Sequence, residues 1–205
     1  FNNIYFTGNK TFASSADNQI YSAAFSAAGS LLWQRSTSGF SFYDKGSGIC
    51  VTNLNYVFVT GSFGGTAVFE GSNALTQDSI VISNGPTDIF LAKYDLSGNL
   101  VWVQNVDNPD YDEGGKIIAD INGDVVLTGI TAAVSGADVY LAKFSDAGNV
   151  IWQTLHTFFP YNVYPKLDLD DAGNISLIFL SSLGESNTGG QGEIYFSRFN
   201  NQGIN

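Results

Sequence analysis

Short apolar runs alternate with polar, glycine-containing turns along the whole chain. The runs at 56–61 ("YVFVTG") and 124–129 ("DVVLTG") are rich in Val, Leu, Tyr and Phe and too short for helices. Between the runs stand Ser-Gly-Asn, Ala-Gly-Asn and Asn-Gly-Asp, which are sequences that close tight hairpins. No stretch of useful length has the apolar spacing of an amphipathic helix. The pattern predicts an all-β protein of antiparallel strands joined by short turns.

The pattern also repeats. The stretch 88–104 ("DIFLAKYDLSGNLVWVQ") returns at 138–153 as "DVYLAKFSDAGNVIWQ", and alignment on its glycine gives four copies. The glycines are Gly29, Gly98, Gly148 and Gly203. A tryptophan follows four positions later in three of the copies, at Trp33, Trp102 and Trp152. The same residue type at the same aligned position in several copies indicates an internal repeat. We expect the three tryptophans to be structurally equivalent and mostly buried between neighbouring sheets.

Each copy holds four short runs, so the predicted unit is a four-stranded antiparallel meander. Full units cover 19–63, 88–131 and 138–181, and single strands remain at 4–8 and 193–200. Repeats of this kind are typical of a β-propeller, in which consecutive four-stranded blades cover each other's faces. Three units are too few to close a ring, so we expect the chain to be a fragment of a larger propeller.

One long insertion, 64–87, separates the first unit from the second. Inside it, "TAVFEG" and "DSIVIS" have the apolar content of strands, and we expect them to pair as an extra hairpin. A basic residue also recurs on the first strand of three copies, at Lys93, Lys143 and Arg198. Strand alternation puts this residue on the face opposite its aromatic neighbours or at the rim.

Residues 60–104 resemble the SBBP-type β-propeller repeat of bacterial exported proteins, which is common in Bacteroidetes. The resemblance is carried by Asp-Ile-Phe-Leu-Ala-Lys-Tyr, then Ser-Gly-Asn, then Trp, and it extends over nearly the whole chain. The first copy departs from the pattern with Ala24 in the Lys column, and the third lacks its Thr-Gly. The resemblance implies a secreted or surface-displayed propeller, often joined to other modules and sometimes to a type IX secretion sorting domain.

The net charge of the chain limits the classes of molecule that it can bind. Among 205 residues, 8 are basic and 19 acidic, which gives a net charge of −11. Such a surface repels phosphate backbones and anionic lipids, so we expect neither nucleic acid partners nor membrane insertion. The sequence has no Met and opens within a strand-like run, so we expect it to be part of a longer chain. Cys50 is the single cysteine, and its apolar run predicts a core position.

An acidic loop is the first candidate site. It contains Asp107, Asp110, Asp112 and Glu113 within seven residues. Clustered carboxylates can supply the oxygen ligands that calcium prefers, although the spacing is not that of an EF-hand. The alternative is an ordinary solvated loop, which we favour because the matching loops of the other copies are not acidic. The segments 120–124 and 168–174 also resemble fragments of a calcium loop, but Asx-rich hairpin turns need the same residues.

An aromatic stretch is the second candidate. "HTFFPYNVYP" at 156–165 carries four aromatic side chains where the preceding copy carries acids. They are Phe158, Phe159, Tyr161 and Tyr164. Exposed at a rim, these rings could stack on sugars or bind a protein partner, and buried, they would only cap the core. The two candidate loops occupy the same point of successive units, so we expect them to lie side by side.

The residues give little support for catalysis. His156 is the only histidine, and no Gly-x-Ser-x-Gly motif is present to mark a nucleophile. Acidic residues are plentiful, but nothing singles out a pair for glycoside hydrolysis. We therefore expect a non-enzymatic extracellular or cell-surface module, requiring no cofactor, that binds protein or carbohydrate or spaces other domains. The alternative is a hydrolase or lyase domain on a propeller scaffold.

Overall fold

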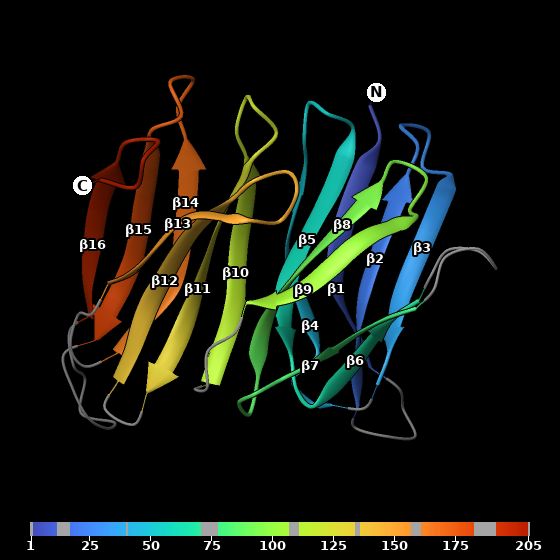
Figure 1. The fold of residues 1–205 in the computed structure, drawn as a ribbon, viewed down its shortest axis with the longest axis horizontal. Coiled ribbons are helices and arrows are strands. Elements are labelled where there is room, and N and C mark those ends of the chain that lie inside the picture. Colours follow the sequence, from blue (N-terminus) through green and yellow to red (C-terminus); the bar gives the residue numbers. More distant parts are fainter. Residues whose placement is uncertain are drawn as a thin grey trace.

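The computed structural model describes residues 2–11, 17–39, 41–70, 78–106, 111–133, 136–156, 161–182 and 192–204. These residues form sixteen β-strands and contain no helix. Pairing is antiparallel throughout, apart from single parallel contacts such as the one between Ala137 and Tyr161. The all-β, antiparallel prediction is confirmed. The strands fall into four groups, which we call the first to fourth sheets (Figure 1).

The first sheet is a three-stranded meander extended by a hairpin from the insertion. Its strands in spatial order are β1 (Ile4–Thr11), β2 (Asn18–Phe25), β3 (Leu31–Ser38), β6 (Thr66–Phe69) and β7 (Ser79–Ile82). β6 and β7 pair with each other, which confirms the hairpin predicted within 64–87. The hairpin then joins the outer edge of β3 through Thr37 and Ser38. The insertion therefore completes a sheet other than the one from which it leaves.

The other three sheets are meanders. The second contains β4 (Lys45–Val51), β5 (Tyr56–Phe63), β8 (Asp88–Asp95) and β9 (Leu100–Val106). The third contains β10 (Tyr111–Ala119), β11 (Val125–Ala133), β12 (Gly136–Phe144) and β13 (Val150–His156). The fourth contains β14 (Tyr161–Leu169), β15 (Ile175–Ser182) and β16 (Gly192–Phe199).

The repeat in the sequence and the sheet in space are out of phase by two strands. The unit 88–131 supplies β8 and β9 to the second sheet and β10 and β11 to the third. The segments 107–110 and 157–160 therefore connect the last strand of one sheet to the first strand of the next. The second and third sheets are each made from the second half of one unit and the first half of the following one.

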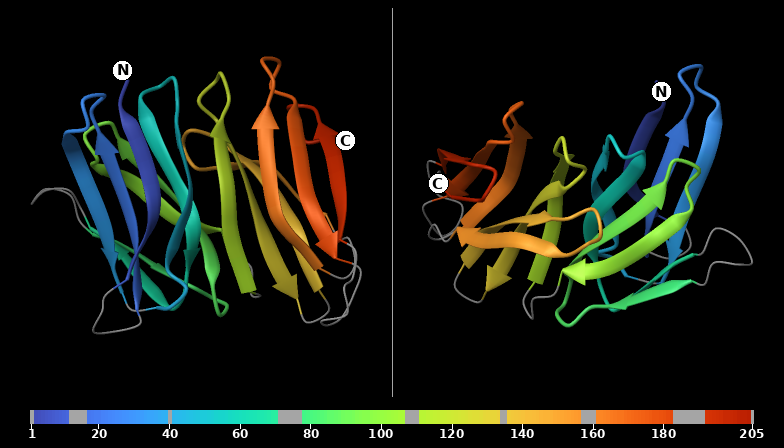
Figure 2. Two further views of the ribbon diagram at one scale, coloured as in Figure 1. Left: turned by 180° about the vertical axis from the view of Figure 1, so that it is seen from behind. Right: turned by 45° about the horizontal axis from the view of Figure 1, so that its top comes forward.

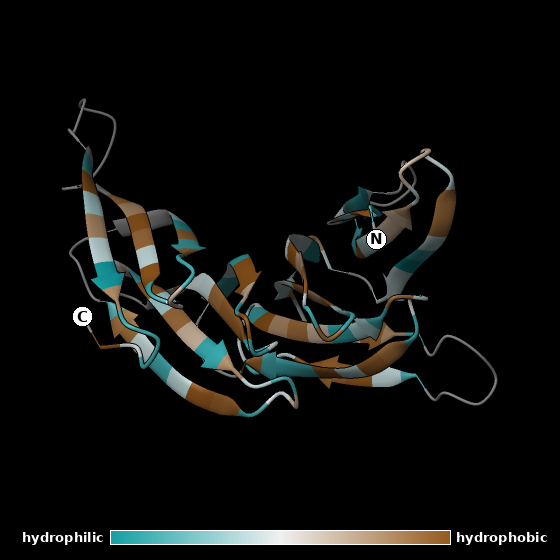
Figure 3. Ribbon diagram, turned by 90° about the horizontal axis from the view of Figure 1, so that it is seen from above, coloured by the Kyte–Doolittle hydropathy of each residue, from teal (hydrophilic) through white to brown (hydrophobic). Residues whose placement is uncertain are grey.

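The sheets stand side by side along an open arc, with the two termini at opposite ends (Figures 1 and 3). The first strands of the second, third and fourth sheets are β4, β10 and β14, which we call the inner strands. β10 contacts both β4 and β14, and β4 contacts β1. Seen from behind in Figure 2, β10 and β14 stand in front, while β9 and β13 belong to the opposite side.

A separate apolar core fills each interface between neighbouring sheets. Along β5, Val57 and Val59 pack into the core shared with the first sheet, and Phe58 packs into the core shared with the third. This is the period-two alternation expected of a strand covered on both faces. The third core joins strands of the third and fourth sheets, with Leu141 and Phe199 among its fully buried members.

The repeated tryptophan lies on the repeated glycine of the next sheet. A Cβ on Gly98 would stand 2.6 Å from the Trp33 ring, and Gly148 and Gly203 face Trp102 and Trp152 in the same way. The three tryptophans are thus equivalent, as predicted. Trp33 is 6% exposed, whereas Trp102 and Trp152 are only partly buried. The predicted burial is therefore met fully by Trp33 and in part by the other two.

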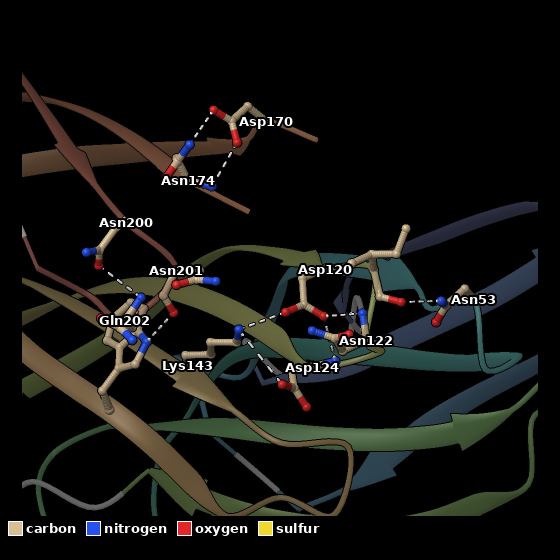
Figure 4. A network of polar contacts seen from close by, with 12 residues as sticks. Asn53, Asp120, Asn122, Asp124, Lys143, Asp170, Asn174, Asn200, Asn201 and Gln202 are labelled. Carbon is tan, nitrogen blue, oxygen red and sulfur yellow. Dashed lines mark hydrogen bonds and ion pairs between the residues drawn. The ribbon is translucent and has the colours of Figure 1, made fainter. Parts of the chain in front are cut away.

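The basic residue that recurs on the first strand of each repeat unit lies on β8, β12 or β16 of the sheets and binds a carboxylate at a turn. Lys143 Nζ lies 2.7 Å from Asp120 and 3.8 Å from Asp124, and the lysine is almost fully buried (Figure 4). Arg198 makes the equivalent contact with Asp170 at 2.7 Å. The buried lysine is possible because its charge is neutralised and its ammonium hydrogen-bonded at the turn.

Lys93 has a different partner. Thr52 stands where the third sheet has Asp120, so the lysine turns to the neighbouring sheet and binds Asp146 at 2.7 Å. Its ammonium also lies 3.6 Å from the centre of the Tyr56 ring, close enough for a cation–π contact. The interaction joins the second sheet to the third, which a repeat pattern alone could not indicate.

Candidate functional site: a pocket between the second and third sheets

Most of the two predicted loops lies outside the described residues. This holds for Asp107, Asp110, Phe158 and Phe159. Tyr161 and Tyr164 belong to the inner strand β14. This differs from the expectation that they lie in a loop. Whether the two loops lie side by side stays a prediction.

The two remaining acidic residues of the calcium prediction do not converge. Asp112 and Glu113 are neighbours on β10, so their side chains point to opposite faces of the strand. Asp112 is 1% exposed, whereas Glu113 is partly exposed and lies 3.6 Å from Lys45. Within the part of the chain that the structure describes, no group of three or more potential metal ligands is found.

Asp112 lies instead at a pocket between the second and third sheets. The pocket has a volume of about 360 Å³. Its lining comes from two strands of the second sheet and all four of the third: Ile89, Val106, Asp112, Thr131, Tyr140, Gln153, Thr154 and Leu155. Val106 and Leu155 stand just before the segments 107–110 and 157–160. The strands that precede the two loops in the sequence, β9 and β13, therefore contribute to this pocket.

The polar groups of the pocket are held in place by the surrounding strands. The Asp112 N–H donates to the Thr87 carbonyl at 3.0 Å, and the Thr87 hydroxyl donates to the Asp112 carbonyl at 2.9 Å. These bonds fix the backbone of Asp112 across the interface. The Tyr140 hydroxyl donates to Gln153 Oε1 at 3.0 Å. Burial, together with the nearby Asp112 carboxylate, raises the pKa of Tyr140 above its usual value, so the phenol stays protonated.

At the equivalent place in the preceding interface, aromatic rings fill the space. Phe63 stands two residues after the Thr-Gly of β5, where Thr131 stands in β11. The insertion hairpin adds Phe69, whose ring centre lies 5.2 Å from that of Phe90, the counterpart of Tyr140. Phe63, Phe69 and Phe90 are all buried in the first core. The hairpin therefore closes the first interface at the point where the second has a pocket.

The counterpart of Asp112 in that closed interface is Asp44. Both follow a tyrosine and precede the glycine of an inner strand, and the rings of Tyr43 and Tyr111 meet edge to face at 6.0 Å. Asp44 is fully buried and accepts one hydrogen bond, from the Gly64 N–H at 3.1 Å. Burial raises the pKa of its carboxyl to about 6, against the lowering effect of that hydrogen bond.

Sequence reasoning missed Thr131, Gln153 and Thr154 because each looks like an ordinary strand residue. A usable signal was nevertheless present. Two residues after the Thr-Gly position the copies carry Lys10, Phe63, Thr131 and Ser181, so Phe63 is the one aromatic residue of this column, and a hydroxyl at Thr131 marks an interface without that ring. The repeated Tyr-Asp pair at the start of β10 was a second signal, since it placed Asp112 in the fold and not in a loop.

The other candidate residues have structural surroundings. Cys50 is partly buried and packs against the second core, and burial raises the pKa of its thiol to about 12. The His156 ring lies 4.9 Å from that of Phe199 in the fourth sheet, and desolvation lowers the pKa of the imidazole. Asp120 Oδ1 accepts the N–H groups of Asn122 and Asp124, which makes 120–124 an Asx turn as favoured from the sequence.

The segment 168–174 contains the same type of turn. Asp170 Oδ1 accepts the N–H groups of Ala172 and Asn174, and its Oδ2 accepts from the Asn174 side chain at 2.8 Å (Figure 4). The oxygens that a calcium ion would use are thus engaged by the turn itself. These hydrogen bonds hold the pKa of Asp170 below its usual value.

The chain matches no protein-family model, and no curated protein has significant similarity to it. The resemblance to the SBBP-type repeat therefore stays a prediction. Among the described residues, no helix is long and apolar enough to cross a membrane.

Proposed function

We propose that this chain is a non-enzymatic binding module of an exported protein, built as part of a β-propeller, and that the pocket beside Asp112 binds a carbohydrate. The propeller is supported by four neighbouring meanders whose inner strands contact one another in succession. Export to the cell surface or the medium is supported by the resemblance described above.

The observation that carries the carbohydrate proposal is the contrast between two equivalent interfaces. The first is filled by Phe63 and Phe69, and the second holds a pocket at the same place. Repeated packing alone would fill both. A difference at matched positions is where one sheet can do something its neighbours do not.

The lining of the pocket suits a sugar. The carboxylate of Asp112 and the Thr131 and Thr154 hydroxyls can accept hydrogen bonds from hydroxyl groups, and the Gln153 amide offers a donor. Ile89, Val106 and Leu155 supply apolar surface for the C–H faces of a ring. Fixed polar groups beside apolar surface are the usual make-up of a small-molecule pocket.

A binding role is favoured over glycoside hydrolysis by the number of carboxylates. Hydrolysis by the common mechanism needs two, one on each side of the bond to be cleaved. Asp112 is the one carboxylate among the described residues that line the pocket. Its neighbour Glu113 faces the other side of β10.

The test is to fill the pocket with the ring that the first interface already carries. Thr131→Phe reproduces Phe63 and should abolish binding to any member of a panel of neutral di- and trisaccharides bound by the unaltered chain. Val150→Phe, which adds the same ring at an exposed position of β13, is the matched control and should bind normally. Binding by Thr131→Phe at wild-type affinity, or no saccharide bound by the unaltered chain, would overturn the proposal.

A further inference from the structure

A second pocket lies on the other side of β10, along the inner strands. It has a volume of about 380 Å³ and draws residues from β4, β10, β11 and β14. Three of its lining residues are the lysines Lys45, Lys116 and Lys166, all exposed, and Ser47 and Glu113 stand beside them. We call this pocket the lysine groove.

The concentration of positive charge in the groove is unusual for this chain, which has only 8 basic residues in all. Lys93, Lys143 and Arg198 are bound to turn carboxylates, so their charges are already compensated. The Arg35 guanidinium donates to the carbonyls of Gly98 and Gln34. The three groove lysines face a single carboxylate in the groove, that of Glu113. The groove therefore keeps an excess of positive charge on a molecule whose net charge is −11.

The backbone explains why the lysines converge. Each inner strand has a register shift at the same place: between Gly46 and Gly48, between Gly114 and Ile117, and between Val163 and Lys166. Such bulges leave residues out of the ladder and re-aim their side chains, and Lys116 is one of the residues left out on β10. A Cβ on Gly48 would stand 2.6 Å from the Gly115 carbonyl oxygen. Glycine thus lets the bulged segments of β4 and β10 lie close together.

The ion pair inside the groove does not prevent the groove from binding an anion. Lys45 Nζ lies 3.6 Å from Glu113 Oε1, and both side chains are well exposed. An exposed pair of this kind contributes little and exchanges readily for another anion. No ion pair engages Lys116 or Lys166 among the described residues.

We propose that the lysine groove binds an anionic sugar, a glycan unit that carries a carboxylate or sulfate group. Three ammonium groups around one pocket provide the charge, while the exposed Glu113 carboxylate provides a partner for the sugar hydroxyls. The acidic remainder of the surface repels an extended polyanion such as a nucleic acid, but not a single anionic unit held within the groove. The site is separate from the pocket of Asp112, because Asp112 and Glu113 point to opposite faces of β10.

Titration calorimetry at low salt tests the proposal, with a trimer of galacturonic acid as probe and galactotriose as its neutral counterpart. The Thr131→Phe chain, in which the Asp112 pocket is filled, should bind the acidic trimer and not the neutral one. Lys116→Gln and Lys166→Gln should each weaken binding about three- to fivefold, the range expected for one exposed charge pair. Lys10→Gln, which changes the net charge equally at an exposed position of β1, is the matched control and should bind as the unaltered chain does.

Further arms identify what the groove recognises. Inorganic sulfate and a triglutamate peptide should each bind at least about tenfold more weakly than the acidic trimer, since they lack the sugar hydroxyls. Thr131→Phe should bind the acidic trimer normally, which separates this site from the proposed carbohydrate pocket. The proposal is overturned if the acidic trimer does not bind, if Lys10→Gln weakens binding as much as the groove variants, or if the peptide binds equally well.

Discussion

The contact between each tryptophan and the glycine of the next sheet can be tested by a matched pair of substitutions. Gly29 and Gly98 occupy the same position of the repeat and have nearly the same backbone, with φ of +80° and +78°. A Cβ on Gly29 meets nothing within 4 Å, whereas on Gly98 it would stand 2.6 Å from the Trp33 ring. Alanine at either position therefore has the same backbone strain, and only at Gly98 does it also collide with a ring.

The magnitudes follow from these two terms. A left-handed conformation costs a residue with a Cβ roughly 1–2 kcal/mol, which is the loss expected for Gly29→Ala. Gly98→Ala should lose a further ~1–3 kcal/mol, because the buried Trp33 ring must shift. Trp33 can move little, since its Nε1 donates to the Leu96 carbonyl at 3.0 Å.

Urea unfolding followed by circular dichroism measures both losses, and Trp33→Ala completes a double-mutant cycle. Trp33→Ala alone should lower the free energy of unfolding by about 3–5 kcal/mol. In that background Gly98→Ala should cost no more than Gly29→Ala, because the ring is gone. Two results would refute the proposed contact between Trp33 and Gly98. One is an equal loss of unfolding free energy for Gly29→Ala and Gly98→Ala in the unaltered chain, and the other is an undiminished loss for Gly98→Ala in the Trp33→Ala background.

Two further predictions concern carboxylates. Because burial raises the pKa of Asp44 to about 6 in the folded protein, its contribution to stability is complete below its unfolded pKa and is lost as the pH rises through about 6. Asp44→Asn should thus be more stable than the unaltered chain by ~2–3 kcal/mol at pH 7.5 and nearly equal to it near pH 4, and a pH-independent difference would contradict this. If the acidic loop binds calcium, millimolar calcium should raise the melting temperature of the unaltered chain and not that of Asp110→Ala, whereas an unchanged melting temperature leaves an ordinary loop.

The sequence predicted the elements of the fold because each signal for them is local. Turns such as 120–124 and runs such as 56–61 determine their own conformation, and the repeat then fixed which positions face a neighbour. It did not predict that the strands of one unit divide between two sheets. The order of apolar runs along the chain is the same whether a unit forms one sheet or divides between two. Only the hydrogen-bond partners of the strands distinguish these two arrangements.

The candidate sites were harder to predict for a physical reason. The acidic and aromatic loops stood out by composition, but a site is a meeting of residues distant in the sequence. Asp112 and Gln153 meet because β10 and β13 belong to one sheet. Lys45 and Lys166 line one groove because β10 lies against both β4 and β14. Neither meeting follows from the spacing of residues along one strand.

The two-strand offset between unit and sheet determines how such an array can change its length. Excision of the unit 88–131 would remove the last two strands of one sheet and the first two of the next. The surviving halves, β4–β5 and β12–β13, are complementary, because β5 has lost its partner β8 and β12 has lost its partner β11. They can pair into a new complete sheet without leaving an open edge at the join. Loss or duplication of a whole unit is therefore a change in number that preserves every sheet in the interior of the array.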